Sequence, residues 1–240
     1  LVYLHFHPGE YRSLFLYAFL PAIAGVGLLF FIKEKKNATI LTQQKSFPKL
    51  FSFLSYWKKS SPDYKHAAGG LIAFALFNSS DAFLLIRARD VGATDEQVIM
   101  AYIFYNLIYA LFAFPAGTLA DRMGMKKTFL LGLFFFIAAY TGMAFASSAS
   151  HVFALFILYG IYAAIVETVS KAWLSGLCEK EERATALGFY SGITSLMALA
   201  ASGIAGLIWV KAGAAPVFIF AATGTVLVMF YFSLIKRSAH

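Results

Sequence analysis

The stretch that decides the fold lies near the middle of the chain, between two long apolar segments. It reads Gly117-Thr-Leu-Ala-Asp121-Arg122-Met-Gly124-Met-Lys126-Lys127. Gly117 permits two helices to approach closely near a membrane surface, and Gly124 permits a tight reversal of the chain. Asp121 is placed to meet the N-terminus of a neighbouring helix, where a carboxylate is favoured. The basic residues of this motif are expected to stay on the cytoplasmic side of a membrane.

Working outward from the motif, the chain contains several segments long enough to cross a bilayer. A membrane-spanning helix needs about 20 apolar residues, because the hydrocarbon core is roughly 30 Å thick. Seven stretches qualify: Ser13–Ile32, Ala67–Ile86, Val98–Ala120, Thr128–Ala146, His151–Trp173, Leu187–Trp209 and Pro216–Ile235. We therefore predict an all-α, polytopic membrane helix bundle.

The composition agrees with a membrane protein and excludes several other classes. Of the 240 residues, 60% are hydrophobic and 13% are charged, whereas soluble domains have roughly 45–50% and about 25%. A single Cys excludes a disulfide-stapled domain and a cysteine-built metal or iron–sulfur site. In a soluble protein, the net charge of +8 would suggest a nucleic-acid partner. In a membrane protein, the positions of the excess basic residues indicate which loops face the cytoplasm. We expect no cofactor and no nucleic-acid partner.

The distribution of basic residues predicts the orientation in the membrane. The connector Lys33–His66 carries eight Lys residues. If this connector is cytoplasmic and the spans alternate in direction, 16 Lys and Arg residues fall inside and four fall outside. This imbalance predicts a multi-pass protein of the plasma or inner membrane with a cytoplasmic C-terminus.

The motif resembles the signature loop of the major facilitator superfamily, which lies between helices 2 and 3 and recurs in weaker form between helices 8 and 9. One span, a long polar connector and six further spans fit the second location. The first location would require an extra span before a long loop, which fits less well. The segment Glu182–Gly188, which includes Arg183, is similar to the family's short loop entering helix 11.

This resemblance implies a domain organisation. Residues 1–32 would contain the last helix of an N-terminal bundle that is otherwise missing, and residues 33–66 would form the central cytoplasmic loop. Residues 67–240 would form the C-terminal six-helix bundle, helices 7 to 12. The connector itself is expected either as a partly amphipathic segment on the inner surface or as a linker. The partners implied are the lipid bilayer, a small-molecule substrate with protons, and the missing half of the same chain.

Polar residues within the spans provide the candidate site. Ionisable groups inside a bilayer tend to face a cavity or a partner, and the spans contain only Asp81, Glu167 and Lys171. The resemblance puts these residues on helices 7 and 10, which border the central cavity in the family. Helical spacing adds further candidates for substrate binding or coupling: Asn78, Tyr102, Asn106, Tyr109 and Tyr159.

Each charged candidate has a structural interpretation beside the functional one. Asp81 is either a proton-coupling carboxylate or one partner of an ion pair with Arg87 or Arg89 at the outer end of the span. Glu167 and Lys171 stand at i and i+4, the favourable spacing for a helical ion pair, and either clamp the helix or handle substrate or protons. The tyrosines are equally compatible with packing.

Two hypotheses for function remain from the sequence. The first is a secondary active transporter that moves a small solute by alternating access and is driven by a proton or solute gradient, since no phosphate-binding loop is present. The alternative is a non-transporting membrane scaffold that retains the same fold. An enzyme is not expected, because no acid–base or nucleophile constellation emerges. An aromatic cavity with carboxylates suits export of a cationic amphiphile, whereas Arg87, Arg89 and Lys171 equally suit an anion or a sugar.

Overall fold

The computed structural model of the chain describes residues 19, 23, 27 and 55–234. The chain divides into two compact units, residues 1–48 and 49–240, and the second contains the elements described below. The predicted span Ser13–Ile32 and most of the connector Lys33–His66 lie outside the described residues. Within residues 55–234 the order of helices is α3 (Tyr56–Lys59), α4 (Pro62–Ala75), α5 (Ala82–Asp90), α6 (Asp95–Met123), α7 (Met125–Phe145), α8 (Ala149–Gly176), α9 (Arg183–Ala212) and α10 (Ala214–Leu234).

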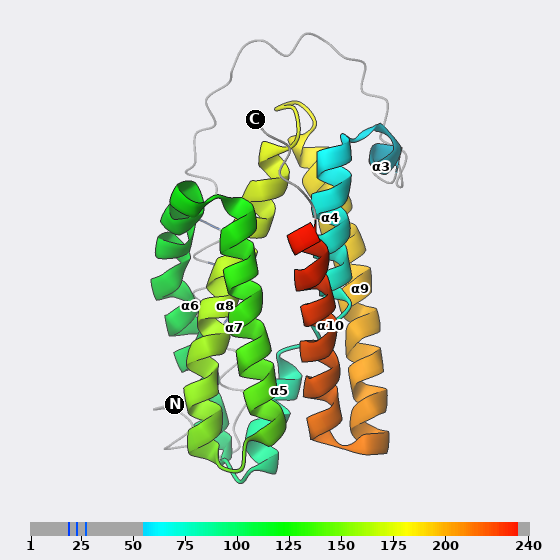
Figure 1. Cartoon of the computed structure of the whole chain (residues 1–240). Coiled ribbons are helices and arrows are strands. Elements are labelled where there is room, and N and C mark those ends of the chain that lie inside the picture. The colour runs from blue at the N-terminus through cyan, green and yellow to red at the C-terminus, as the bar shows by residue number, and fades with distance from the viewer. Residues whose placement is uncertain (1–18, 20–22, 24–26, 28–54, 235–240) are drawn as a thin grey trace. The chain divides into compact units, whose positions relative to one another are not determined.

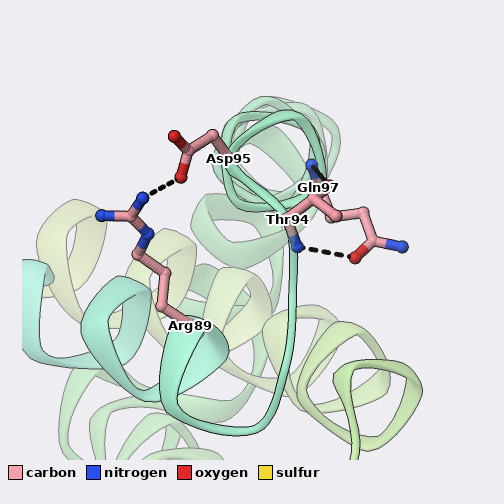
Figure 2. Close-up of polar contacts among 4 residues, drawn as sticks. All are labelled: Arg89, Thr94, Asp95 and Gln97. Atoms are coloured by element: carbon pink, nitrogen blue, oxygen red, sulfur yellow. Dashed lines mark hydrogen bonds and ion pairs between the residues drawn. The ribbon is translucent and has the colours of Figure 1, made fainter.

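Five of the described helices, α6 to α10, are long and apolar enough to cross a membrane. They coincide with the last five predicted spans. The chain is therefore an integral, multi-pass membrane protein. Local sequence explains where the helices begin and end: Thr94 and Gln97 form a capping box at the start of α6 (Figure 2). At the other end, Gly124 (φ +89°) separates α6 from α7.

The prediction of one continuous span over Ala67–Ile86 is wrong. The structure has two shorter helices there, α4 and α5, with residues 76–81 between them outside any helix (Figure 1). The physical reason is the polar run Asn78-Ser79-Ser80-Asp81, because short polar side chains bond nearby backbone groups and compete with the helix. Ser80 Oγ accepts a hydrogen bond from the Ala82 amide, and the Ser80 amide donates to Ser202 Oγ of α9.

The helices form a bundle in which α7 and α8, α6 and α8, and α7 and α10 are packed neighbours, while α4 lies against α9 and α10 (Figure 1). Aromatic rings fill the core between α4, α7 and α8, where Phe136 stacks on Tyr140 with ring centroids 3.9 Å apart. Glycines permit the closest helix contacts: a Cβ at Gly160 of α8 would lie 2.7 Å from Ile108 of α6. This close packing fixes the backbone around the candidate site.

The start of the described region is anchored on α9. The Tyr64 hydroxyl donates a buried hydrogen bond of 2.7 Å to the Ala186 carbonyl oxygen. Trp57 of α3 stacks on Phe189 with ring centroids 5.6 Å apart. Of the predicted connector, residues 55–66 are thus a short helix and the first turn of α4, both packed against the start of α9.

Candidate functional site

A cavity of about 370 Å³ opens between α4, α8 and α9. Its floor is aromatic and aliphatic, and its walls carry amide, hydroxyl and charged groups. The lining residues are Leu71, Phe74, Ala75, Asn78, Tyr162, Val166, Glu167, Ser170, Lys171, Tyr190, Ser191, Thr194, Ser195 and Ala198. An apolar pocket with a few converging polar groups is the usual form of a small-molecule site.

Three of the predicted candidates line this cavity: Asn78, Glu167 and Lys171. The Tyr109 hydroxyl of α6 donates a hydrogen bond of 3.2 Å to Glu167 Oε2, so a fourth candidate contacts the site through Glu167. The expected ion pair between Glu167 and Lys171 does not form, since no nitrogen–oxygen distance between them is within 4.0 Å. Both charges therefore face the cavity without neutralising each other directly.

Asp81 and Tyr159 contact each other and are not among the residues that line this cavity. The Tyr159 hydroxyl donates a hydrogen bond of 2.5 Å to Asp81 Oδ1. Tyr159 is buried, and its ring lies 5.2 Å from those of Tyr105 and Tyr162. This pair joins α8 to the residue that precedes α5, and it was not expected from helical spacing.

The expected ion pair of Asp81 with Arg87 or Arg89 is wrong, because both arginines have other partners. Arg87 donates through Nε to the Met143 carbonyl oxygen (3.1 Å) and through Nη2 to that of Ala146 (2.7 Å). It thereby caps the C-terminal end of α7. Arg89 pairs with Asp95 at the start of α6 (Figure 2). Neither arginine lines the cavity.

Two other candidates lie outside the cavity. Tyr102 is 44% exposed, and its carbonyl oxygen accepts a hydrogen bond of 2.8 Å from Asn106 Nδ2. Asn106 is exposed on the same helix, and its amide is satisfied within α6. The expectation that a mid-span amide must face a cavity to satisfy its hydrogen bonds therefore does not apply to Asn106.

The motif of residues 117–127 forms the end of α6, the turn at Gly124 and the start of α7. A Cβ at Gly117 would lie 4.0 Å from Thr168 Cγ2 of α8, an ordinary van der Waals distance, so the helix packing here does not require glycine. Asp121 is exposed and bonds no helix N-terminus in the described part of the chain, so that expected contact is not formed. Three further motif residues lie around this turn: Arg122 in the last turn of α6, and Lys126 and Lys127 in the first turn of α7. Arg183, outside the motif, is the first residue of α9.

Sequence reasoning missed part of the cavity wall. Four residues of α9 also line the cavity: Tyr190, Ser191, Thr194 and Ser195. The hydroxyls of Thr194 and Ser195 both donate hydrogen bonds to the Ser191 carbonyl oxygen. Small residues such as these also serve close helix packing, so the sequence alone did not mark them as cavity residues. The signal that marks them is their spacing of three and four residues, which puts their hydroxyls on one face of α9.

Four buried side-chain oxygens form no hydrogen bond of normal geometry among the described residues: Asn78 Oδ1, Ser79 Oγ, Tyr140 OH and Ser170 Oγ. Two of them, on Asn78 and Ser170, belong to residues that line the cavity. No group of three or more His, Cys, Asp or Glu side chains in the described residues is arranged to hold a metal ion.

The comparisons with known proteins agree with this architecture. The family model described as Major Facilitator Superfamily matches residues 66–240, so the chain belongs to this family. It is similar to an uncharacterised MFS-type transporter of Methanocaldococcus jannaschii (37% identical over 57% of this chain and 36% of the relative). It is also similar to the multidrug resistance protein MdtL of Shewanella oneidensis (30% identical, 64% of this chain and 39% of the relative).

A third relative is the methyl viologen resistance protein SmvA of Salmonella typhimurium (31% identical over 44% of this chain and 21% of the relative). In each of these comparisons the match covers less than two-fifths of the relative's length. The helix order and the motif loop therefore correspond to one part of a longer family architecture.

Proposed function

We propose that this chain forms the C-terminal half, with the helix that precedes it, of a secondary active transporter for a small solute. The observation that carries the proposal is the cavity between α4, α8 and α9, where Glu167 and Lys171 stand beside hydroxyl and amide groups within a membrane bundle. Charged groups inside a bilayer are costly and are retained where they serve a pathway or a partner. Alternating access would expose this site to one side of the membrane and then to the other.

The exposed faces of α6 and α9 support the presence of a second bundle. In both helices only 11% of the most apolar 18-residue window is buried. Large apolar side chains such as Leu111, Phe114 and Leu199 are exposed there. Since the relatives are much longer than the matched region, we propose that the N-terminal half of the same chain covers these faces. From the distribution of basic residues, we also propose that the C-terminus and the basic motif loop face the cytoplasm.

The direction and substrate that fit best are export of an organic cation. Arg87 and Arg89 bind other groups, so the charged residues that line the cavity are Glu167 and Lys171. Three aromatic rings also line it, those of Phe74, Tyr162 and Tyr190. Aromatic faces and a carboxylate attract cations. Two relatives whose names refer to multidrug and methyl viologen resistance support the same class.

Asp81 is the proposed proton-coupling residue. It lies at the helix break, accepts the Tyr159 hydroxyl hydrogen bond and has no cationic partner among the described residues. Its second carboxylate oxygen accepts no hydrogen bond from a described residue and is the proposed place at which a proton binds. A proton gradient would thus act on the segment that separates α4 from α5.

The test is transport of methyl viologen by the full-length protein in inverted membrane vesicles with an imposed proton gradient. The unsubstituted protein should accumulate the probe, and Glu167→Gln should reduce the initial rate at least about tenfold, equivalent to 1.4 kcal/mol. Glu96→Gln is the matched control, because Glu96 is an exposed carboxylate in the first turn of α6, outside the cavity.

Asp81→Asn tests the coupling separately. We expect it to abolish gradient-driven accumulation and to leave exchange of bound probe across the membrane measurable. Unchanged transport with unchanged pH dependence would remove Asp81 from the coupling role. Absence of any flux for a panel of cations, anions and sugars would favour the alternative function, a membrane scaffold that retains this fold.

A further inference from the structure

The acid and the base that line the cavity do not pair with each other. Glu167 and Lys171 both belong to α8, and an acid four residues before a base is the favourable order for an ion pair within a helix. In the described part of the chain, however, no oxygen of Glu167 lies within 4.0 Å of the Lys171 ammonium nitrogen. A contact with another helix explains why the pair does not form.

This contact comes from Tyr109 of α6. Its hydroxyl donates a hydrogen bond of 3.2 Å to Glu167 Oε2 and so ties the carboxylate to α6. A hydrogen bond to a carboxylate is charge-assisted and stronger than one between neutral groups. Lys171, one helical turn further along α8, has no hydrogen-bond or ion-pair partner among the described residues. Tyr109 therefore keeps the acid and the base of the cavity apart.

The two charges follow one another along the cavity wall. Because a helix rises about 1.5 Å per residue, their backbone positions are about 6 Å apart along α8. Lys171 lies nearer the end of α8 at Gly176, and Glu167 lies one turn deeper in the span. Deeper again, the rings of Phe74 and Tyr162 line the cavity, with centroids 6.0 Å apart. The wall thus presents a positive group, a negative group and then aromatic surface.

The sign and order of these groups restrict the ligand that fits them. Charges inside a bilayer are costly unless they are paired. An organic cation at Glu167 would lie beside the Lys171 ammonium and be repelled by it, and an anion at Lys171 would meet the Glu167 carboxylate in the same way. A ligand that carries both an ammonium group and a carboxylate pairs both residues and adds no net charge to the span.

We propose that the cavity selects zwitterions, in which an ammonium group and a carboxylate stand at opposite ends of a small apolar frame. The ammonium contacts Glu167, the carboxylate contacts Lys171, and any further apolar part lies against Phe74 and Tyr162. Tyr109 is a positioning residue, because it keeps Glu167 from pairing with Lys171. This selection rests on the transport function proposed above and narrows its substrate class to organic cations that also carry an anionic group.

The test compares three probes that share one benzene ring and differ in charge. They are para-(aminomethyl)benzoate, a zwitterion; para-methylbenzylamine, a cation; and para-methylbenzoate, an anion. The Kd of each is obtained with the full-length protein in detergent from the rise in Tm with probe concentration, since a ligand that binds only the folded state raises Tm. We expect the zwitterion to bind at least about tenfold more tightly than either singly charged probe.

Three variants attribute this preference to the cavity. Lys171→Met should abolish the preference for the zwitterion over the cation and should leave binding of the cation equal or tighter, because a like charge has been removed. Tyr109→Phe frees Glu167 to pair with Lys171 and should reduce the same preference, which makes it the second test if Lys171→Met does not fold. Lys180→Met is the matched control, because Lys180 is exposed in the loop after α8, outside the cavity, and the full preference should remain.

Four outcomes would overturn the proposal. Equal Kd values for the zwitterion and the cation would mean that Lys171 does not contact the ligand, while transport of cations could still stand. A preference retained in both Lys171→Met and Tyr109→Phe would place the zwitterion elsewhere in the protein. Loss of the preference in Lys180→Met would show that it reports surface charge. If none of the three probes binds, zwitterion selection fails, and the separate flux assay with methyl viologen decides whether the proposed function fails with it.

Discussion

The Tyr159 hydroxyl lies 2.5 Å from Asp81 Oδ1, and this hydrogen bond connects the middle of α8 to the residue that precedes α5. The two residues are 78 positions apart in the chain. The bond fixes one oxygen of the Asp81 carboxylate, and the other accepts no hydrogen bond from a described residue. Its strength should therefore be visible in both stability and function.

Tyr159→Phe removes this bond without changing the shape of the ring. We expect a loss of about 1.5–3 kcal/mol in the free energy of unfolding, the range for a hydrogen bond to a charged group. The loss should appear as a lower Tm in detergent. Tyr102→Phe is the matched control: its side chain is 44% exposed and its hydroxyl forms no hydrogen bond among the described residues, so removing it should leave Tm unchanged. Equal losses in both variants would contradict the assignment.

Gly160 is required for the contact between α8 and α6. A Cβ there would lie 2.7 Å from Ile108 Cγ2 and 3.1 Å from the Tyr105 carbonyl oxygen. Gly160→Ala should therefore cost about 1–3 kcal/mol through overpacking. The control is Gly203→Ala in α9, where nothing lies within 4 Å of the new Cβ and the higher helix propensity of Ala should maintain stability. Thermal unfolding of the two variants side by side distinguishes packing from propensity.

Gly124 is the motif residue whose backbone requires glycine. Its φ of +89° is a conformation that L side chains rarely adopt. We expect Gly124→Ala to destabilise the turn between α6 and α7 by about 1–2 kcal/mol. Gly176→Ala, at the end of α8 with open space around it, should be close to neutral. Limited proteolysis at the 117–127 loop provides a local readout, and unchanged cleavage in Gly124→Ala would contradict the prediction.

Arg87 and Arg89 are close in sequence but should contribute differently to the stability of the fold. Arg87→Met removes two hydrogen bonds to carbonyl oxygens at the end of α7 and should cost about 2–3 kcal/mol, since the donor is charged. Arg89→Met removes an ion pair whose side chains are 61% and 55% exposed, which is worth less than about 1 kcal/mol. The two Tm values in detergent, measured at low and high salt, should separate the roles. A larger decrease in Tm for Arg89→Met than for Arg87→Met would refute this order.

The long spans could be predicted because hydrophobic length alone determines them. Five predicted segments coincide with α6 to α10, whose ends lie within a few residues of the predicted ones. The interruption of the segment Ala67–Ile86 could not be predicted from length, since residues 76–81 are bracketed by apolar residues on both sides. The run of four polar residues at 78–81 was the available signal, and its competition with the helix was underestimated.

The candidate site was predictable only in part. Glu167 and Lys171 were candidates because they are charged residues in an apolar span, and the structure places both at a cavity. Their pairing could not be predicted, because spacing on a helix permits an ion pair without requiring one. The partner of Asp81 was also inaccessible, since the contact with Tyr159 depends on how α8 packs against the helix break. The hydroxyls of α9 were overlooked because small residues also serve helix packing.

The break at residues 76–81 also has a mechanical consequence. α4 lies against α8, α9 and α10, whereas α5 lies against α6 and α8 and holds the end of α7 through Arg87 (Figure 1). The two short helices therefore share α8 but otherwise pack against different helices. If α4 tilts together with α9, the joint between the halves can absorb the rotation. The chain would then change shape without breaking a helical hydrogen bond inside the bilayer, where such a break is most costly.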